Sequence, residues 1–571
     1  MQQRSHSPSP ITPVKAGMLF VCLWALMFVL YLPAAKAGFV SDFTGWLQQV
    51  RYRPFWEYMN RSGFKVVSMY QGTQFVTWVY YQLFGASEWA WHILFITLHT
   101  ANATLLYILC ATLLRDAGVE QYRPIGYTGV VLFCVSPYVS EVVVWEPSFH
   151  YLQGLLILLL VLVWVQRYCY TGERRYVWYA CVAYLFSIHT LEVFYITPWL
   201  ALSLGWFYKG QLPQGKAMFG RVARYFFLPM LLLFALRLLE YRLLYGDWVS
   251  RIGSQTVLSL QDAGLGKPLK YLFHLLPLGR YLPAEWHIGS ASMGDLRSNI
   301  YAFCDSGVGM TMFYGGCVSC FAWGLLRYGK MSGRAKVALL LGVWTFIALL
   351  LITPLWFGDL LLIVYDRYTY FTIPFLFMLV AIGIWSIRGR YVRVALLVVL
   401  LLANLRYTIQ VNRYWGKGAR IVDRLLHHLP ETGDRTVILL NMPESMHGAP
   451  MMSASDPSEY KLMRDLLVPE RPIKGKVYDA LSFNMVTPDD GAHAQVLNDS
   501  TIRVKLNQYG TWWWYQAMGG HDYENEDYKL RINPGGDYDL TLKKPANGYI
   551  LFYQVGDKWK QVDMSKTYEQ Y

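Results

Sequence analysis

A few charged side chains interrupt an otherwise apolar sequence, and these residues could carry chemistry. Asp42 lies in the segment GFVSDFTGW, directly after the first long apolar run. A carboxylate there could accept the proton of a hydroxyl group or orient that group, which is how carboxylates act as general bases. The alternative is structural, because an Asp at this position could also cap a helix in the loop.

Two arginines are suited to phosphate. Arg367, in VYDRYTYFTIP, carries a permanently charged guanidinium that can make paired hydrogen bonds to phosphate oxygens. It could instead anchor the chain at the level of the lipid headgroups, beside Tyr368 and the neighbouring tyrosines. Arg237, near the end of another apolar run, could meet a diphosphate or simply pair with Glu240.

Four more titratable residues lie at or inside apolar runs, where charge is costly and therefore suggests function. Glu141 in PYVSEVVVW and Glu192 in HTLEVFYITP could bind a hydroxyl group, a metal or a phosphate-binding arginine. The alternative for both is a buried structural ion pair. His92 and His99 share one helix face and could bind phosphate or metal, although a hydrogen-bonded packing histidine is the more common role.

The amino-acid composition indicates that these residues are positioned by a membrane domain. Hydrophobic residues make up 54% of the 571 residues and charged residues 16%, with a mean hydropathy of +0.25, which excludes a soluble globular enzyme. Apolar runs of about 20 residues recur from residue 16 to residue 410, and each can cross roughly 30 Å of hydrocarbon. We therefore predict an α-helical polytopic domain over residues 1–410, with about 11 transmembrane helices.

The basic residues predict the orientation of this domain. The net charge of +13 is divided among short loops between apolar runs, which makes no continuous track for nucleic acid. By the positive-inside rule these loops are cytoplasmic, as is the N-terminus, and the first apolar run is a retained anchor. Residues 36–88 and 246–306 are then outer loops of a protein in a bacterial-type inner membrane, and residues 411–571 are extracytoplasmic.

Local patterns predict several smaller elements. Residues 70–84 have the spacing of an interfacial amphipathic helix, and KYLFHLLPLGRYLP in the second outer loop favours another. The apolar stretch between Arg175 and Lys209 has basic clusters at both ends, so it predicts two short helices that turn near SIHTLEVFY. Strand-like runs after residue 411, separated by Gly and Pro turns, predict a small α/β or β-rich soluble domain.

Four segments together resemble the membrane glycosyltransferases of the GT-C superfamily, especially the protein O-mannosyltransferases and their tetratricopeptide-containing transmembrane relatives. WAWHILFITLHTANATLLYIL resembles the family's HxxNxxLH span, SPYVSEVVVW its HPxxxEAVAW, LEVFYITP its KExxxxxxP and YDRYTYFTIP its ERYLYLPS. The segments occur in the family's order and on the expected membrane side. The resemblance covers roughly residues 36–410 and does not include the C-terminal domain, which has no tetratricopeptide repeats.

This resemblance implies an enzyme that transfers a sugar from a polyprenyl-phosphate-type lipid donor to a protein, lipid or glycan acceptor on the extracytoplasmic side. Asp42 would be the catalytic base or acceptor-orienting group, and Arg367, with Arg237, would hold the donor phosphate. The substrate-binding residues implied by the matched motifs are Glu141, Glu192, His92, His99 and Tyr368. Membrane lipid surrounds such an enzyme, and no nucleic acid takes part.

The sequence also departs from the family's motifs. Ser41 and Asp42 stand where the family has paired acids, so no cofactor is certain and a divalent metal is only one option. Phe95 replaces the Asn of the first motif, and Leu191 replaces the Lys before Glu192. The sugar could therefore differ from mannose.

Two other classes remain open on the sequence alone. A transporter or flippase for a lipid-linked glycan would also be polytopic, although polar residues would then be expected at mid-membrane rather than at one surface. A membrane anchor that presents the C-terminal domain to partners would leave Asp42 and Arg367 without a role. If the chain is an enzyme, Asp42, Glu141, Glu192 and Arg367 should share one water-filled cavity.

Overall fold

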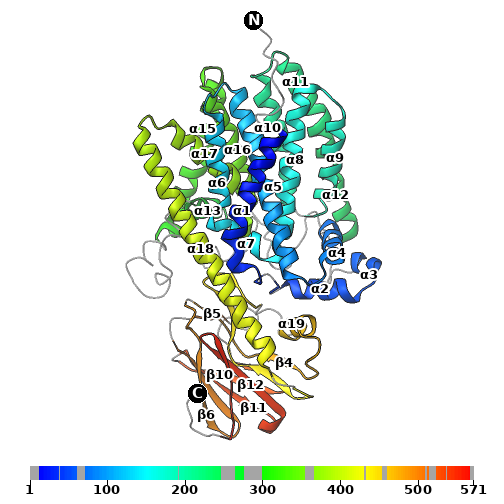
Figure 1. The fold of residues 1–571 in the computed structure, drawn as a ribbon, viewed down its shortest axis with the longest axis vertical. Coiled ribbons are helices and arrows are strands. Elements are labelled where there is room, and N and C mark those ends of the chain that lie inside the picture. Colours follow the sequence, from blue (N-terminus) through cyan, green and yellow to red (C-terminus); the bar gives the residue numbers. More distant parts are fainter. Residues whose placement is uncertain are drawn as a thin grey trace.

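The computed structural model describes residues 12–565 apart from 38, 41, 61–70, 191, 246–263, 276–298, 354–365, 430–431, 453–458, 486, 508–510, 514–521 and 535. A bundle of helices forms the first part of the chain and a smaller unit rich in strands forms the last part, with one long helix running from the bundle into that unit (Figure 1). The predicted fold class, an α-helical polytopic domain followed by a strand-containing domain, is confirmed.

Seven segments among the described residues are helical, long and apolar enough to cross a membrane, and a bent pair would make an eighth. The helices of these segments are α1 (Pro13–Tyr31), α5 (Glu88–Asp116), α6 (Tyr122–Cys134) with α7 (Ser140–Val144), α8 (Phe149–Thr171), α11 (Gly215–Val222) with α12 (Leu228–Tyr245), α15 (Gly307–Arg327), α16 (Gly333–Leu350) and α18 (Arg390–His428). The other expected spans are shorter helices, namely α9 (Arg175–Ser187), α10 (Thr197–Lys209) and α17 (Ile373–Ser386). The chain therefore turns between α9 and α10, as predicted.

The outer faces of the bundle are apolar. Val398 is 47% exposed, and Val399 and Leu402 are each 62% exposed, along one stretch of α18. Val308, Met312 and other apolar residues of α15 are exposed in the same way. Apolar surface on this scale is favourable only against hydrocarbon, so these faces contact lipid in an integral membrane protein.

The helix α18 connects the two parts of the molecule. Its 39 residues give a length of about 58 Å, roughly twice the hydrocarbon thickness. Polar side chains attach it to the bundle, because Thr408 donates to the carbonyl oxygen of Val135 (2.7 Å) and Asn412 donates to that of Leu30 (2.9 Å). The boundary expected at residue 410 falls within this unbroken helix, and its last turns lie against the strand domain (Figure 1).

A bend after α6 turns the chain at the end of the bundle nearest the strands. The axes of the segments Tyr122–Cys134 and Pro137–Val144 differ by 55°. Pro137 cannot continue the helix, and the Ser136 hydroxyl accepts a hydrogen bond from the Tyr138 backbone N–H to start a new turn. The bend presents α7, with Glu141 in its first turn, at this end of the bundle.

Short helices surround the same end of the bundle. They are α2 (Asp42–Tyr52), α3 (Phe55–Asn60), α4 (Gln71–Phe84) and α13 (Lys267–Leu275). The interfacial helix predicted over residues 70–84 corresponds to α4, whose Thr73 hydroxyl donates to the carbonyl oxygen of Thr190 (2.9 Å). Only the first part of the second predicted interfacial helix, α13, lies within the described residues.

In its described residues the strand domain contains three sheets and one α-helix, α19 (Glu459–Leu467). The first sheet has the order β13 (Lys558–Gln561), β12 (Tyr549–Val555), β1 (Thr436–Leu439) and β4 (Val477–Asp479), with β1 parallel to both neighbours. The second has the order β6 (Ala492–Asn498), β7 (Thr501–Leu506), β11 (Tyr538–Leu542), β10 (Tyr528–Ile532) and β9 (Tyr523–Glu524). The third has β3 (Ala449–Pro450), β2 (Met442–Met446), β5 (Ser482–Met485) and β8 (Thr511–Trp513). In addition, α19 packs on α2, which joins the two domains.

Candidate active site

The centre of the candidate site is an ion pair between two residues that the sequence analysis selected. Arg367 lies in the short helix η10 (Asp366–Thr369), and its Nη1 pairs with Oε1 of Glu141 from α7. The backbone N–H of Arg367 also donates to Oε2 of Glu141 (2.8 Å). Both oxygens of the Glu141 carboxylate therefore bind Arg367, although the two residues are 226 positions apart in the sequence. These paired contacts fix the position of the guanidinium.

Two aromatic rings flank the guanidinium. The Cζ atom of Arg367 lies 4.8 Å from the ring centroid of Trp145 and 4.9 Å from that of Tyr368. Aromatic faces attract a cation, and a cation packed against them is less hydrated than one in bulk water. The structure therefore holds a desolvated cation in a fixed position at the end of the bundle nearest the strands.

Trp145 also connects this cation to the loop that carries Asp42. Its indole N–H donates to the carbonyl oxygen of Val40 (3.2 Å), two residues before Asp42. Trp46, one turn into α2, makes an edge contact with Phe149 at 6.5 Å between ring centroids. The backbone at the start of α2 is thus held close to Arg367, while the side chain of Asp42 lies outside the described residues.

The helix α13 contributes a second layer beside η10. Nε2 of His274 lies 3.2 Å from Oδ1 of Asp366, and the Tyr138 hydroxyl donates to the carbonyl oxygen of His274 (2.7 Å). One turn earlier, Lys270 pairs with Asp305 and lies over the ring of Tyr301. The second outer loop therefore reaches the neighbourhood of Arg367 through this helix.

Tyr271, on the same helix, reports the electrostatics of the site. Burial raises the pKa of its phenol well above the ordinary value, and the nearby Tyr368, Asp366 and Glu141 raise it further. Arg367 has the opposite effect. Tyr271 is therefore a neutral hydroxyl group at every physiological pH, able to donate a hydrogen bond but not to act as a base.

Local sequence explains why η10 presents these residues. The Thr369 hydroxyl donates to the carbonyl oxygen of Asp366 (2.7 Å), and the Tyr370 N–H donates to that of Arg367 (3.1 Å), which closes a tight turn. Pro374 then lies in the first turn of α17, where its missing N–H costs nothing. The polar turn is consequently confined to the few residues before the helix.

Tyr370 extends the site into the bundle. Its hydroxyl lies 2.7 Å from Nδ1 of His99 and accepts a hydrogen bond from Nδ2 of Asn102 (3.3 Å). His99 is fully buried against the ring of Phe133. His92 lies two turns earlier on α5 and is also buried. The two predicted histidines thus share one helix, and His99 is linked to η10 through Tyr370.

Arg237 and Glu192, two further predicted residues, belong to other segments of the bundle. Arg237, on α12, pairs with Oε2 of Glu240 (2.5 Å), and Nε2 of His189 lies 3.7 Å from the same oxygen. Glu192 begins the short helix η4 (Glu192–Ile196), and its side chain lies outside the described residues. The ring of Phe194, in η4, is 5.8 Å from that of Phe371, so this segment also borders η10.

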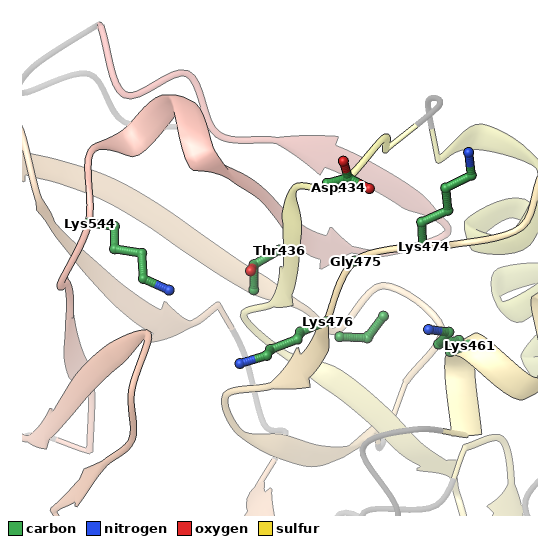
Figure 2. A pocket seen from close by; sticks show the side chains of 8 residues that line it. Asp434, Thr436, Lys461, Lys474, Gly475, Lys476 and Lys544 are labelled. Carbon is green, nitrogen blue, oxygen red and sulfur yellow. The ribbon is translucent and has the colours of Figure 1, made fainter.

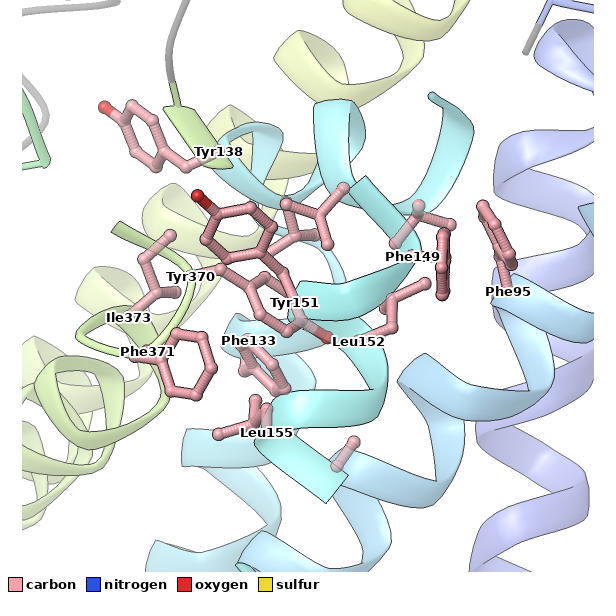
Figure 3. Packing of buried hydrophobic residues seen from close by; sticks show 14 of the residues in the cluster. Phe95, Phe133, Tyr138, Phe149, Tyr151, Leu152, Leu155, Tyr370, Phe371 and Ile373 are labelled. Atoms are coloured by element: carbon pink, nitrogen blue, oxygen red, sulfur yellow. The ribbon is translucent and has the colours of Figure 1, made fainter. Parts of the chain in front are cut away.

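Aromatic packing holds the segments together. Figure 3 shows Tyr138, Tyr151, Tyr370 and Phe371 gathered between the helices, with Phe133 and Leu152 close to them. Tyr151 meets Tyr368 and Phe371 at 6.3 and 6.1 Å between ring centroids. The polar residues of the site therefore lie on a closely packed layer of aromatic and aliphatic side chains.

Sequence reasoning did not single out Asp366, His274 or Tyr271. A signal was available, because Lys270, Tyr271 and His274 share one face of a short amphipathic stretch. Glu146 was also not selected, although it is only 2% exposed and its Oε2 has no hydrogen-bond partner within the described residues. Buried acids without partners are costly and so suggest a function.

The arrangement is suited to binding an anion at the mouth of the bundle. It combines a fixed guanidinium with aromatic walls and the neutral phenol of Tyr271, and guanidinium groups are well suited to phosphate esters. Within the described residues, no group of three or more His, Cys, Asp or Glu side chains is placed to hold a metal ion.

No protein-family model and no curated protein matches the chain. Among solved structures, it is similar to ArnT from Cupriavidus metallidurans bound to undecaprenyl phosphate, with a TM-score of 0.33, 14% identity, and coverage of 81% of this chain and 90% of that one. It is also similar to the archaeal oligosaccharyltransferase AglB from Archaeoglobus fulgidus in complex with an inhibitory peptide and a dolichol-phosphate, with a TM-score of 0.40, 11% identity, and coverage of 81% and 64%. At these values the likeness carries no residue and no activity over to this chain.

Proposed function

We propose that this protein is a membrane glycosyltransferase that takes a sugar from a polyprenyl-phosphate-type donor and transfers it to an acceptor on the extracytoplasmic side. Arg367 binds the donor phosphate, and Asp42 accepts the proton of the attacking hydroxyl group. As the bond between the sugar and the phosphate oxygen breaks, negative charge grows on the departing phosphate. A fixed cation beside it stabilises that transition state.

The observation that carries this proposal is the fixed position of Arg367. Glu141 holds the residue at both its backbone and its side chain, and the rings of Trp145 and Tyr368 hold the guanidinium at a membrane-facing end of the bundle. In this proposal the phosphate of the lipid donor reaches Arg367 from the membrane surface. A preorganised cation binds such a group without paying to reorganise water during the reaction.

The distribution of charge supports the orientation. The connections on the side away from the strand domain, such as those between α8 and α9 and between α15 and α16, carry clusters of Lys and Arg (Figure 1). The positive-inside rule places that side in the cytoplasm. The candidate site and the strand domain then lie together on the outer side of the membrane. A transferase on that side that uses a lipid-linked sugar needs no nucleotide.

Donor binding tests the proposal directly. Purified protein in lipid nanodiscs should bind undecaprenyl phosphate, and Arg367→Lys should weaken that binding about tenfold, because a lysine keeps the charge but loses the paired hydrogen bonds. The matched control is Arg393→Lys, since Arg393 stacks on Trp385 at 4.5 Å beyond the other end of α17. If the two variants bind undecaprenyl phosphate with equal affinity, Arg367 is not part of the donor site. Sugar transfer from a labelled polyprenyl-phosphate donor then tests the reaction itself.

A further inference from the structure

A cleft in the strand domain gathers four lysines. It has a volume of about 420 Å³ and lies where the first residues of β1 and β4 meet α19 and the turn before β12. Its lining residues are Asp434, Thr436, Lys461, Lys474, Gly475, Lys476, Val477 and Lys544. Figure 2 shows Lys476 and Lys544 on one side of Thr436 and Gly475, and Lys461 and Lys474 on the other.

The cleft has an excess of positive charge on one side. Lys544 pairs with Asp527 at 2.6 Å, and Lys476 pairs with Glu526, so these two amines are neutralised by the domain itself. Among the described residues Lys461 and Lys474 form no hydrogen bond, although Lys461 interacts electrostatically with Asp465 of the same helix. Two ammonium groups therefore face one cleft, and its described lining contains one acid, Asp434.

The backbone that carries these lysines is held rigidly. Gly475 passes so close to the backbone of Arg435 that a Cβ atom would collide with its carbonyl oxygen, and the Val437 N–H donates to the carbonyl oxygen of Lys476 (2.8 Å). This contact fixes Lys474 and Lys476 against the start of β1. Fixed cations bind an anion with a smaller loss of backbone entropy than cations on a mobile loop.

Lys461 is fixed in a similar way through α19. Arg464, one turn later and only 1% exposed, donates to the carbonyl oxygens of Leu426 (2.9 Å), Leu429 (3.1 Å) and Arg471 (2.7 Å). These bonds attach α19 to the end of α18. Because α19 also packs on α2, the cleft is joined by rigid elements to the helix that begins at Asp42.

We propose that this cleft binds an acidic glycan through its phosphate or carboxylate groups, and that the glycan is the acceptor or part of it. The proposal rests on the proposed function, which places the acceptor on the side of the strand domain. Among the described residues that line the cleft, Val477 is the only apolar one, so they offer a peptide no pocket for an anchoring side chain. The same described lining contains no aromatic side chain, and so no stacking surface of the kind that single-stranded nucleic acid uses.

Binding can be measured without any sugar transfer. The full-length protein in nanodiscs of uncharged lipid is titrated with four probes: oligogalacturonate, inorganic tripolyphosphate, neutral dextran oligomers and oligoglutamate. We expect binding of oligogalacturonate, of tripolyphosphate or of both, weakening as salt is raised because charges on the surface are screened. The probe that binds identifies whether the recognised group is a carboxylate or a phosphate.

The variant pair Lys461→Gln with Lys474→Gln should weaken this binding at least about tenfold, since two ammonium groups that line the cleft are lost. The matched control, Lys558→Gln with Lys560→Gln, changes two exposed lysines at the other end of the same sheet and should bind as the unchanged protein does. Equal weakening by both pairs, or no binding of any anionic probe, would overturn the proposal. Oligoglutamate binding as tightly as the acidic glycan would overturn the assignment to a glycan.

The proposed function fails in a different experiment. Loss of anion binding and of transfer to an acidic glycan in the cleft variant, with donor binding and transfer to a neutral acceptor retained, assigns the cleft to acceptor recognition. Absence of transfer in every variant, with anion binding intact, would contradict the glycosyltransferase and leave the anion site standing.

Discussion

Two of the acid–arginine pairs in the described part of the membrane domain have nearly equal burial, and they lie at opposite ends of the bundle. The side chains of Asp116 and Arg115 are 5% and 17% exposed, and those of Glu141 and Arg367 are 6% and 14% exposed. Burial alone therefore does not tell which of the two pairs is functional. The difference lies in what surrounds each pair.

At the end away from the strands, the acid is saturated with donors. Asp116 accepts hydrogen bonds from the hydroxyl groups of Tyr170 and Tyr208 as well as from Arg115, and Gln166 in turn donates to Tyr208 (2.9 Å). This network ties α5, α8 and α10 together. Its polar groups satisfy one another, which is the pattern of a structural site.

At the end nearest the strands, aromatic rings surround the cation. Trp145 and Tyr368 lie over the guanidinium of Arg367, and a third ring, Tyr271, lies close by as a neutral phenol. Aromatic rings hold the Arg367 guanidinium in place without taking up the N–H groups that an anion would use. At the other end, the Asp116 carboxylate already accepts hydrogen bonds from two hydroxyl groups and from Arg115, so it has no capacity left for a ligand. Similar residue types thus serve stability at one end and, we propose, phosphate binding at the other.

The largest expected effect comes from Asp42. Asp42→Asn keeps the shape of the side chain and removes its capacity to accept a proton, so turnover should fall about 100-fold or more while undecaprenyl phosphate binding is retained. Asp116→Asn is the matched change at the other end and should leave turnover nearly normal. Near-normal transfer by Asp42→Asn would move the base to another acid, Glu141, Glu192 or the buried Glu146.

Glu141→Gln tests whether the pair nearest the strands positions the cation. The variant keeps an acceptor for the Arg367 N–H but loses the charge-assisted bond that fixes the guanidinium in position, so donor binding should weaken about tenfold. Turnover should fall by at least the same factor. Asp116→Asn should instead lower the melting temperature without changing donor affinity. If both variants change only the melting temperature, the two ends do not differ and the comparison is wrong.

A smaller effect is expected from His274. The change His274→Phe keeps a ring of similar size beside Tyr138 but removes the contact with Asp366, so η10 should be less well positioned. We expect a rise of about three- to tenfold in the KM for the donor with little change in kcat, because the lost contact positions a binding group. His427→Phe, on an exposed face of α18, is the control. A fall in kcat at constant KM would give His274 a role in the chemical step.

Sequence reasoning located the membrane helices because a long apolar run must cross the bilayer as a helix, whatever its neighbours are. It also selected Glu141 and Arg367, because isolated charges next to apolar runs have few stable roles. It did not find the pairing of His274 with Asp366, which depends on how α13 folds back across 92 positions. Sequence reasoning also could not predict the order of the short strands, because tertiary packing decides which strands pair.

Asp42 and Glu192 mark a different limit. Their roles, like those of Arg237, His92 and Tyr368, stay predictions, and the side chains of Asp42 and Glu192 lie outside the described residues. The start of α2 is close to Arg367 through Trp145 and Val40. Arg237 forms a separate cluster with Glu240 and His189.

The smallest effect on activity, and a specific effect on stability, is expected at Glu444 in the strand domain. This residue lies at an irregularity between β2 and β5, and its Oε2 is buried without a hydrogen-bond partner within the described residues. Burial raises the pKa of its carboxyl group to about 8. The unfolded chain releases this proton near the ordinary pKa of about 4.3, so the folded domain loses stability as the pH rises from there to about 8 and loses no more above it. Glu444→Gln should therefore raise the free energy of unfolding by roughly 1–3 kcal/mol at pH 9 and leave it unchanged at pH 4, with transfer activity intact. Thermal unfolding followed across this pH range measures the difference, with the exposed Glu470→Gln as control; a gain that is the same at both pH values would show that Glu444 is not a buried, protonated acid.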